Sequence, residues 1–174
     1  MVSNIVSLMT ELRFPADGYE LRKAEGGDMP FAADCMKESI LMSVPDDEAK
    51  HSCLWINEIL HAASIAAEKE MIRSEMFILE NTSEEKEGIL WMGMSRDQFT
   101  CEETGYILGL FLRKELRGKG LGKALIKCAE DWCRKNEMFL LTLNAGSANL
   151  SAKGLYESLG YKERSVVMRK RLHR

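Results

Sequence analysis

The chain has 174 residues, of which 45% are hydrophobic and 29% are charged, and its net charge at pH 7 is -3. This length suits one domain with its own core, and the composition is that of a globular protein. The slightly acidic net charge gives no electrostatic reason to expect a nucleic-acid or membrane partner.

Residues 1–17 are a weakly amphipathic lead that ends near Pro15, and they fit either an extra helix or a disordered arm. They lack a cationic start and a long apolar run, so neither a signal segment nor a membrane span is expected, and we predict a cytoplasmic protein. We assign residues 18–174 to a single domain. Its five cysteines form no Cys-x-x-Cys pair, and its three histidines have no metal-ligand spacing. Reduced thiols and no metal site are therefore predicted.

The first half of the domain predicts a strand, two helices and a hairpin. Alternating residues over 19–24 predict the strand, and a Gly-Gly-Asp break followed by a proline predicts a helix over 29–41. The acidic segment 43–47 predicts the start of a second helix that continues to about residue 68. Apolar runs at 76–79 and 88–94 flank a polar turn and predict an antiparallel hairpin.

In the second half, a turn near residues 97–102 leads into a long strand over 106–112. A strongly amphipathic helix begins after residue 120, and an apolar run over 138–143 predicts a further strand. Another helix carries Tyr156, and the chain is predicted to end in a strand pair at 161–164 and 166–172. The predicted fold class is therefore α/β, with a mixed, mainly antiparallel sheet flanked by helices.

The run Arg-Gly-Lys-Gly-Leu-Gly at 117–122 is the most informative motif, because it joins the long strand to the amphipathic helix. Alternate glycines allow a tight turn and close approach of a ligand, and the helix directs its positive end at the same place. A dinucleotide fingerprint fails at Lys123, and a phosphate-binding P-loop fails at Arg117 and Ala124. The run predicts an anion cradle for a pyrophosphate, and an ordinary glycine-rich turn is the alternative.

The motif Arg-x-x-Gly-x-Gly, followed by an asparagine before a helix with Leu155-Tyr156-Glu157 and Leu159-Gly160-Tyr161, resembles the GNAT superfamily of acyl-CoA-dependent N-acyltransferases. The resemblance covers roughly residues 106–172. It implies a GNAT-type twisted sheet with acetyl-CoA as the co-substrate, in a cleft between the central strands. The resemblance assigns acetyl-CoA binding to the following residues: Leu110, Phe111, Leu112, Arg117, Gly118, Lys119, Gly120, Leu121, Gly122, Lys123, Asn149 and Tyr156.

Acyl transfer to an amine needs a group that protonates the departing thiolate, and the resemblance implies Tyr156 for this role. A phenol stays protonated at neutral pH, although the spacing of Tyr156 also fits core packing. Asn149 suits either the cap of this helix or a bond to the pantetheine amide. Gly109 interrupts the long strand, which indicates a bulge or a close approach.

The general base is not identified by the sequence. Some relatives carry a glutamate on the long strand, and that position falls at Tyr106 here. Glu103 lies nearby but would face the other side of a regular strand, so a water relay is an alternative.

The resemblance implies transfer of an acetyl group to a primary amine, of a small molecule or of a protein or peptide, in a ternary complex. Acidic residues at 46–48 would suit a cationic acceptor, although the helix dipole alone explains them. A non-catalytic acyl-CoA sensor or partner module is the alternative function. The oligomeric state is left open, with a homodimer as one alternative.

Overall fold

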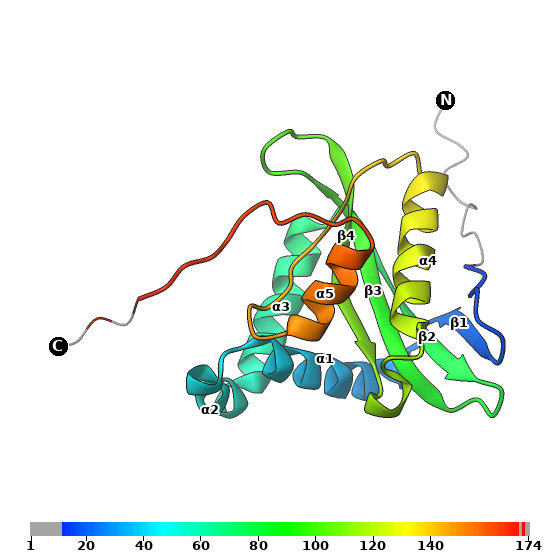
Figure 1. Cartoon of the computed structure of the whole chain (residues 1–174), viewed down its shortest axis with the longest axis horizontal. Helices are drawn as coiled ribbons and strands as arrows, with labels where there is room; N and C mark the ends of the chain where they lie inside the picture. Colours follow the sequence, from blue (N-terminus) through cyan, green and yellow to red (C-terminus); the bar gives the residue numbers. More distant parts are fainter. Residues whose placement is uncertain (1–11, 171, 173–174) are drawn as a thin grey trace.

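The computed structural model of the chain describes residues 12–170 and residue 172 (Figure 1). A five-stranded sheet has the order β1-β2-β3-β4-β5. The strands are β1 (Tyr19–Lys23), β2 (Arg73–Asn81), β3 (Lys86–Arg96), β4 (Glu103–Leu112) and β5 (Leu141–Leu143). The first four pair antiparallel, and β5 runs parallel to β4. The predicted mixed, mainly antiparallel sheet and its β2–β3 hairpin are therefore confirmed.

In the described part of the chain, five helices accompany the sheet: α1 (Met29–Ser43), α2 (Asp46–Leu54), α3 (Ile56–Glu70), α4 (Leu121–Lys135) and α5 (Leu150–Ser158). Figure 1 shows α4 and α5 side by side in front of the strands, with α1 below them. Short 3₁₀ turns precede α1 at Gly26–Asp28 and follow β4 at Lys114–Leu116. Within the described residues, none of the helices is both long and apolar enough to cross a membrane.

The two faces of the sheet are covered by separate hydrophobic clusters. Ile78 and Ile89 are fully buried in one cluster with residues of α1, whereas their neighbours Leu79 and Leu90 are fully buried in the other. Successive strand side chains point to opposite faces, so the clusters lie on opposite sides of the sheet. The larger cluster takes up the apolar face of α4, whose buried side chains are Leu121, Leu125, Ile126, Cys128, Ala129, Trp132 and Cys133.

A buried carboxylate fixes the start of α1 against the strands. Asp28, with a side chain only 4% exposed, accepts hydrogen bonds from Arg22 at 2.7 and 3.1 Å and contacts the Lys86 ammonium at 2.6 Å. Its Oδ2 also accepts the backbone N–H of Glu25 at 2.8 Å. The Arg22 hydrogen bonds hold the pKa of Asp28 well below its usual range. The network ties β1, β3 and the entry to α1 together.

The single second helix predicted to end near residue 68 is wrong, because α2 and α3 are separate. Trp55 has φ -113° and ψ 19°, which lies outside the helical region. Both pieces contact α1, and the break at Trp55 lets the chain turn between them. The predicted strand over 138–143 likewise forms only at Leu141–Leu143. Met138 is buried, and its amide donates to the Cys133 carbonyl at 2.9 Å, so this part of the run closes the end of α4.

The predicted C-terminal strand pair is also wrong, because residues 161–170 and 172 form no strand. Their alternating pattern has no ladder partner, and the side chains of residues 166–168 are 71–97% exposed. Lys153 pairs with Glu163, Arg164 with Asp97, and Arg169 with Glu48. These ion pairs link the segment to different parts of the domain, and Figure 1 shows its end leading away from the domain.

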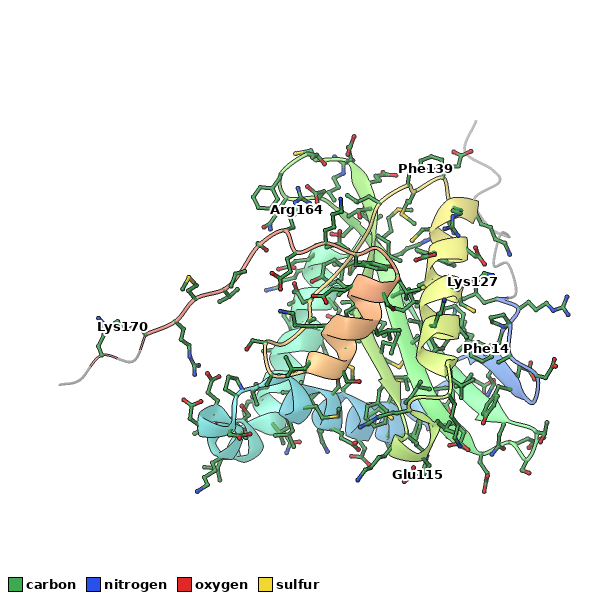
Figure 2. The ribbon with its side chains drawn as sticks, in the orientation of Figure 1. Phe14, Glu115, Lys127, Phe139, Arg164 and Lys170 are labelled. Carbon is green, nitrogen blue, oxygen red and sulfur yellow. The ribbon has the colours of Figure 1, made fainter. Side chains whose placement is uncertain are left out.

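The prediction of a helical or disordered lead falls mainly on residues 1–11, which lie outside the described residues. Residues 12–17 are not helical. Leu12 and Phe14 are buried in the larger cluster, and the Phe14 ring packs edge-on against Tyr19 with centroids 6.4 Å apart. Figure 2 shows Phe14 at the β1 end of the sheet. This part of the lead thus contributes to the core.

Candidate active site

The glycine motif forms a tight turn immediately before α4. Gly118 and Gly120 have φ values of +77° and +83°, the left-handed region that glycine adopts without steric cost. Gly120 is the N-cap of α4 and offers no side chain to the free amides. Ala124 is the first residue whose amide donates into the helix, to the Gly120 carbonyl at 3.1 Å. The preceding amides of the first turn are therefore available to an anion at the positive end of the helix.

The space around this turn is open. A Cβ added to Gly118 or Gly120 would meet no atom within 4 Å, so the backbone is open on the outer side. Lys119 and Lys123 are exposed beside it, whereas Leu121 is buried and can offer only its backbone. The turn thus presents amides, a helix N-terminus and two ammonium groups on one exposed surface.

The sheet opens beside the turn, because β5 pairs with only part of β4. Their parallel pairing covers only Gly105–Ile107 against Leu141–Leu143, whereas β4 continues to Leu112. Leu112 and Phe111 are buried in opposite clusters, and Leu110 packs on the α4 side. These three side chains serve the core, so an extended ligand could use their backbone groups.

A bulge in β4 lies at the point where β5 stops pairing. Trp91 of β3 faces Gly109, but the next residue, Met92, faces Ile107, so one residue of β4 is extra. A Cβ on Gly109 would lie 2.5 Å from the Met36 sulfur of α1. Both features expected at Gly109, a bulge and a close approach, are therefore present. They change the direction of the strand beside the edge that β5 leaves unpaired.

The Arg117 side chain turns toward the protein. Its Nε donates to the Leu112 carbonyl at 2.9 Å, its Nη2 contacts Glu38 of α1 at 3.0 Å, and its guanidinium lies 5.2 Å from the centre of the Phe111 ring. The guanidinium thus anchors the turn to β4 and α1. Among the described residues, the groups that contact this guanidinium belong to α1 and β4, and the sequence alone did not indicate these contacts.

Helix α5 meets this region at the start of α4. A Cβ on Gly122 would lie 3.1 Å from Leu155 of α5 and 3.8 Å from Leu112 of β4, so the three elements converge there. Tyr156, next to Leu155, is half-buried against the larger cluster, with its ring 5.9 Å from that of Tyr161. Burial raises the pKa of Tyr156, so its hydroxyl stays protonated at neutral pH.

The loop from β5 to α5 is held against α1. A Cβ on Gly146 would lie 2.1 Å from the Ser43 carbonyl oxygen, a contact that only glycine permits. Asn149 caps α5, because its Oδ1 accepts the Ala152 amide at 3.1 Å. The capping role considered for Asn149 is therefore present.

The two candidates for the base lie on β4 before it parts from β5. Glu103 is exposed at the start of the strand, opposite Arg96, and Tyr106 pairs with Gly93. Burial, with the negative charge of Glu70 on α3, raises the pKa of Tyr106. Tyr106 therefore remains a phenol at neutral pH, and the carboxylate that acts on it is Glu70 of α3.

Glu70 is a neighbour that sequence reasoning missed, because nothing local links the end of α3 to the middle of β4. The Ser95 hydroxyl donates to the Glu70 carbonyl at 3.3 Å. A hollow of about 430 Å³ opens beside them and is lined by Glu70, Ile72, Ser95, Arg96 and Gln98.

The acidic residues expected on the acceptor side start α2. Asp46, Asp47 and Glu48 occupy its first turn, where they face the positive helix end. Glu48 is engaged in an ion pair with Arg169 of the C-terminal segment. Figure 2 shows that segment passing Arg164, beside the β3–β4 turn, and ending near Lys170. In the described part of the chain, no group of three or more His, Cys, Asp or Glu residues is placed to hold a metal ion.

Comparisons with known proteins agree with this geometry. A model of the acetyltransferase (GNAT) family matches residues 51–161. The uncharacterized N-acetyltransferase YycN of Bacillus subtilis is 28% identical over 88 residues, which are 51% of this chain and 56% of that protein. The chain thus spans about half the length of the curated relatives it matches.

Solved structures share the fold over most of their length. A putative acetyl transferase from Pyrococcus furiosus superposes with a TM-score of 0.66 at 22% identity, covering 88% of this chain and 99% of that one. The structure of AAC(6')-Iy in complex with a bisubstrate analog superposes with a TM-score of 0.59 at 18% identity, with the same coverage. The family model covers well over half of the residues, including the glycine turn and α5. This chain belongs to the acetyltransferase (GNAT) family.

Proposed function

We propose that this protein transfers an acetyl group from acetyl-CoA to a primary amine, by direct attack of the amine in a ternary complex. The observation that carries the proposal is the left-handed glycine turn at the N-terminus of α4, beside the stretch of β4 that β5 leaves unpaired. The turn would form an anion site, next to the strand edge that β5 leaves unpaired. A thioester carrier in which a pyrophosphate is joined to an arm with amide groups would use both.

The turn residues would hold the pyrophosphate. Amides of residues 118–123 provide the hydrogen bonds, and the Lys119 and Lys123 ammonium groups add charge. The backbone of Leu110–Leu112 would pair with the pantetheine arm, and the side-chain amide of Asn149 would reach it from α5. A protein that shares the fold was solved with a bisubstrate analog containing CoA, which supports this assignment.

In the reaction, the acceptor nitrogen forms a bond to the acetyl carbon while the carbon–sulfur bond breaks. The nitrogen loses a proton, and the thiolate gains one. Tyr156 supplies the proton to sulfur, because its half-buried hydroxyl stays protonated at neutral pH, and solvent then reprotonates the phenolate. This balance needs no metal or redox partner.

The proton of the ammonium leaves by a less direct route. Tyr106 stays protonated and cannot accept it, so its hydroxyl serves to orient the amine or a water molecule. Exposed Glu103, at the start of the same strand, receives the proton through water. We therefore expect the rate to rise with pH until most of the acceptor is the free amine. The pKa of the acceptor itself should set this rise in the pH–rate profile.

The test begins with binding. Acetyl-CoA at 100 times its dissociation constant should stabilise the fold by about 2.7 kcal/mol. That stabilisation should raise the melting temperature by roughly 5 to 10 °C for a chain of this size. ATP and NAD at the same concentration are the controls, because they carry a pyrophosphate without the pantetheine arm. A melting curve raised by the controls but unmoved by acetyl-CoA would overturn the proposal.

A further inference from the structure

The contact between Glu38 and Arg117 joins the glycine turn to a helix on the other side of β4. Glu38 Oε1 lies 3.0 Å from Arg117 Nη2, and the two residues are 79 positions apart in the chain. The same guanidinium donates through Nε to the Leu112 carbonyl at 2.9 Å. It also stacks 5.2 Å from the centre of the Phe111 ring.

These contacts engage the guanidinium of Arg117 on several sides. Its guanidinium is held in place by a carboxylate, a carbonyl and an aromatic face, from α1 and the end of β4. The turn that follows has no comparable anchor, because Gly118 and Gly120 carry no side chain and Lys119 is exposed. Buried Leu116 fixes the preceding 3₁₀ turn. Arg117 is therefore the last side-chain anchor before the left-handed residues.

We propose that Glu38 is a positioning residue for coenzyme A. By holding Arg117 against α1, it fixes the orientation of the amides at 118–123 that would receive the pyrophosphate. This inference rests on the proposed function and adds a residue outside the glycine motif. It assigns the phosphate charge to the amides, Lys119 and Lys123, and it gives Arg117 a structural task.

The expected effect is moderate. The Arg117 side chain is 32% exposed and that of Glu38 is 54% exposed, so water screens their attraction. Exposed ion pairs contribute at most about 1 kcal/mol, so loss of this one should weaken CoA binding roughly two- to five-fold. The turnover number at saturating acetyl-CoA should not change, because Glu38 does not touch the reacting atoms.

The experiment compares four variants by calorimetric titration with CoA and by thermal melting without ligand. Glu38→Gln keeps the size of the side chain and removes its charge. Asp34→Asn is the matched control, since it removes an exposed carboxylate of the same helix whose partner is Lys37 at 3.2 Å. Arg117→Gln and the double variant Glu38→Gln/Arg117→Gln complete a cycle.

We expect Glu38→Gln to weaken CoA binding two- to five-fold, and its unliganded melting temperature to match that of Asp34→Asn. The double variant should bind CoA no more weakly than Arg117→Gln alone, because Glu38 acts through Arg117. In steady-state assays, the KM for acetyl-CoA should rise while kcat stays constant.

Two results would overturn the inference while leaving the proposed function intact. One is wild-type affinity in Glu38→Gln. The other is tighter binding, which would mean that Glu38 competes with the phosphates for Arg117. If the wild-type protein itself fails to bind CoA, the proposed function falls, and this inference falls with it.

Discussion

Gly120→Glu should abolish CoA binding while the domain stays folded. The φ of +83° makes any side chain at this position costly, by about 1–2 kcal/mol for leaving the right-handed regions. No atom lies within 4 Å of the added Cβ, so steric overlap contributes nothing further. The new carboxylate would enter the region assigned to the pyrophosphate. Two unit charges 4 Å apart repel by about 4 kcal/mol at an effective dielectric constant of 20, or roughly three decades in affinity.

Gly120→Ala is the matched control, because it carries the same backbone cost without the charge. Calorimetric titration with CoA should show a small loss of affinity for Gly120→Ala and no measurable binding for Gly120→Glu. Both variants should melt within a few degrees of each other. Equal affinity of the two variants would refute the placement of the phosphates at this turn. Loss of cooperative melting in the Ala variant would refute the claim that the turn is open.

Three further outcomes test other parts of the account. Tyr156→Phe keeps the ring that packs near Tyr161, so CoA affinity should not change. In a CoA-release assay, kcat should fall about 10²- to 10⁴-fold. If acyl transfer is rate-limiting and its rate is unchanged, Tyr156 has only a core-packing role. Gly146→Ala should lower the melting temperature, at a cost of about 1–3 kcal/mol, because its Cβ would strike the Ser43 carbonyl, whereas Gly154→Ala, where the Cβ meets nothing within 4 Å, should stabilise α5. Asp28→Asn should cost about 3 kcal/mol at neutral pH in urea unfolding. Because the folded-state pKa of Asp28 is lowered, its contribution is present above the unfolded pKa of about 3.9 and is lost as pH falls through the folded value; an equal acid-induced loss in Asp28→Asn would contradict this.

Local signals made much of the fold predictable. The glycine motif before an amphipathic run predicted a turn at the N-terminus of α4, and the left-handed Gly118 and Gly120 are the physical basis of that pattern. Gly109 predicted the irregularity in β4 because glycine inside an apolar strand has few other uses. In each case, the local backbone geometry favours glycine, so the residue type itself signals the geometry.

Features that depend on distant partners were not predictable. The contact of Arg117 with Glu38 spans 79 positions, and neither residue signals the other in the sequence. The C-terminal alternation predicted strands, but a strand needs a ladder, and the Arg164 side chain instead pairs with Asp97. Trp55 likewise breaks a run that looked like one helix, because α2 and α3 each pack on α1.

The central claim is that the glycine turn before α4 and Tyr156 act together in acetyl transfer. The most direct measurement follows amine-dependent release of free CoA from acetyl-CoA, with a panel of small primary amines and amine-bearing peptides and with product mass as confirmation. We predict turnover with at least one amine, an N-acetylated product, and a deep loss of rate in Tyr156→Phe at unchanged acetyl-CoA affinity. Tight acetyl-CoA binding without amine-dependent release across the panel would contradict the claim and identify a binding module.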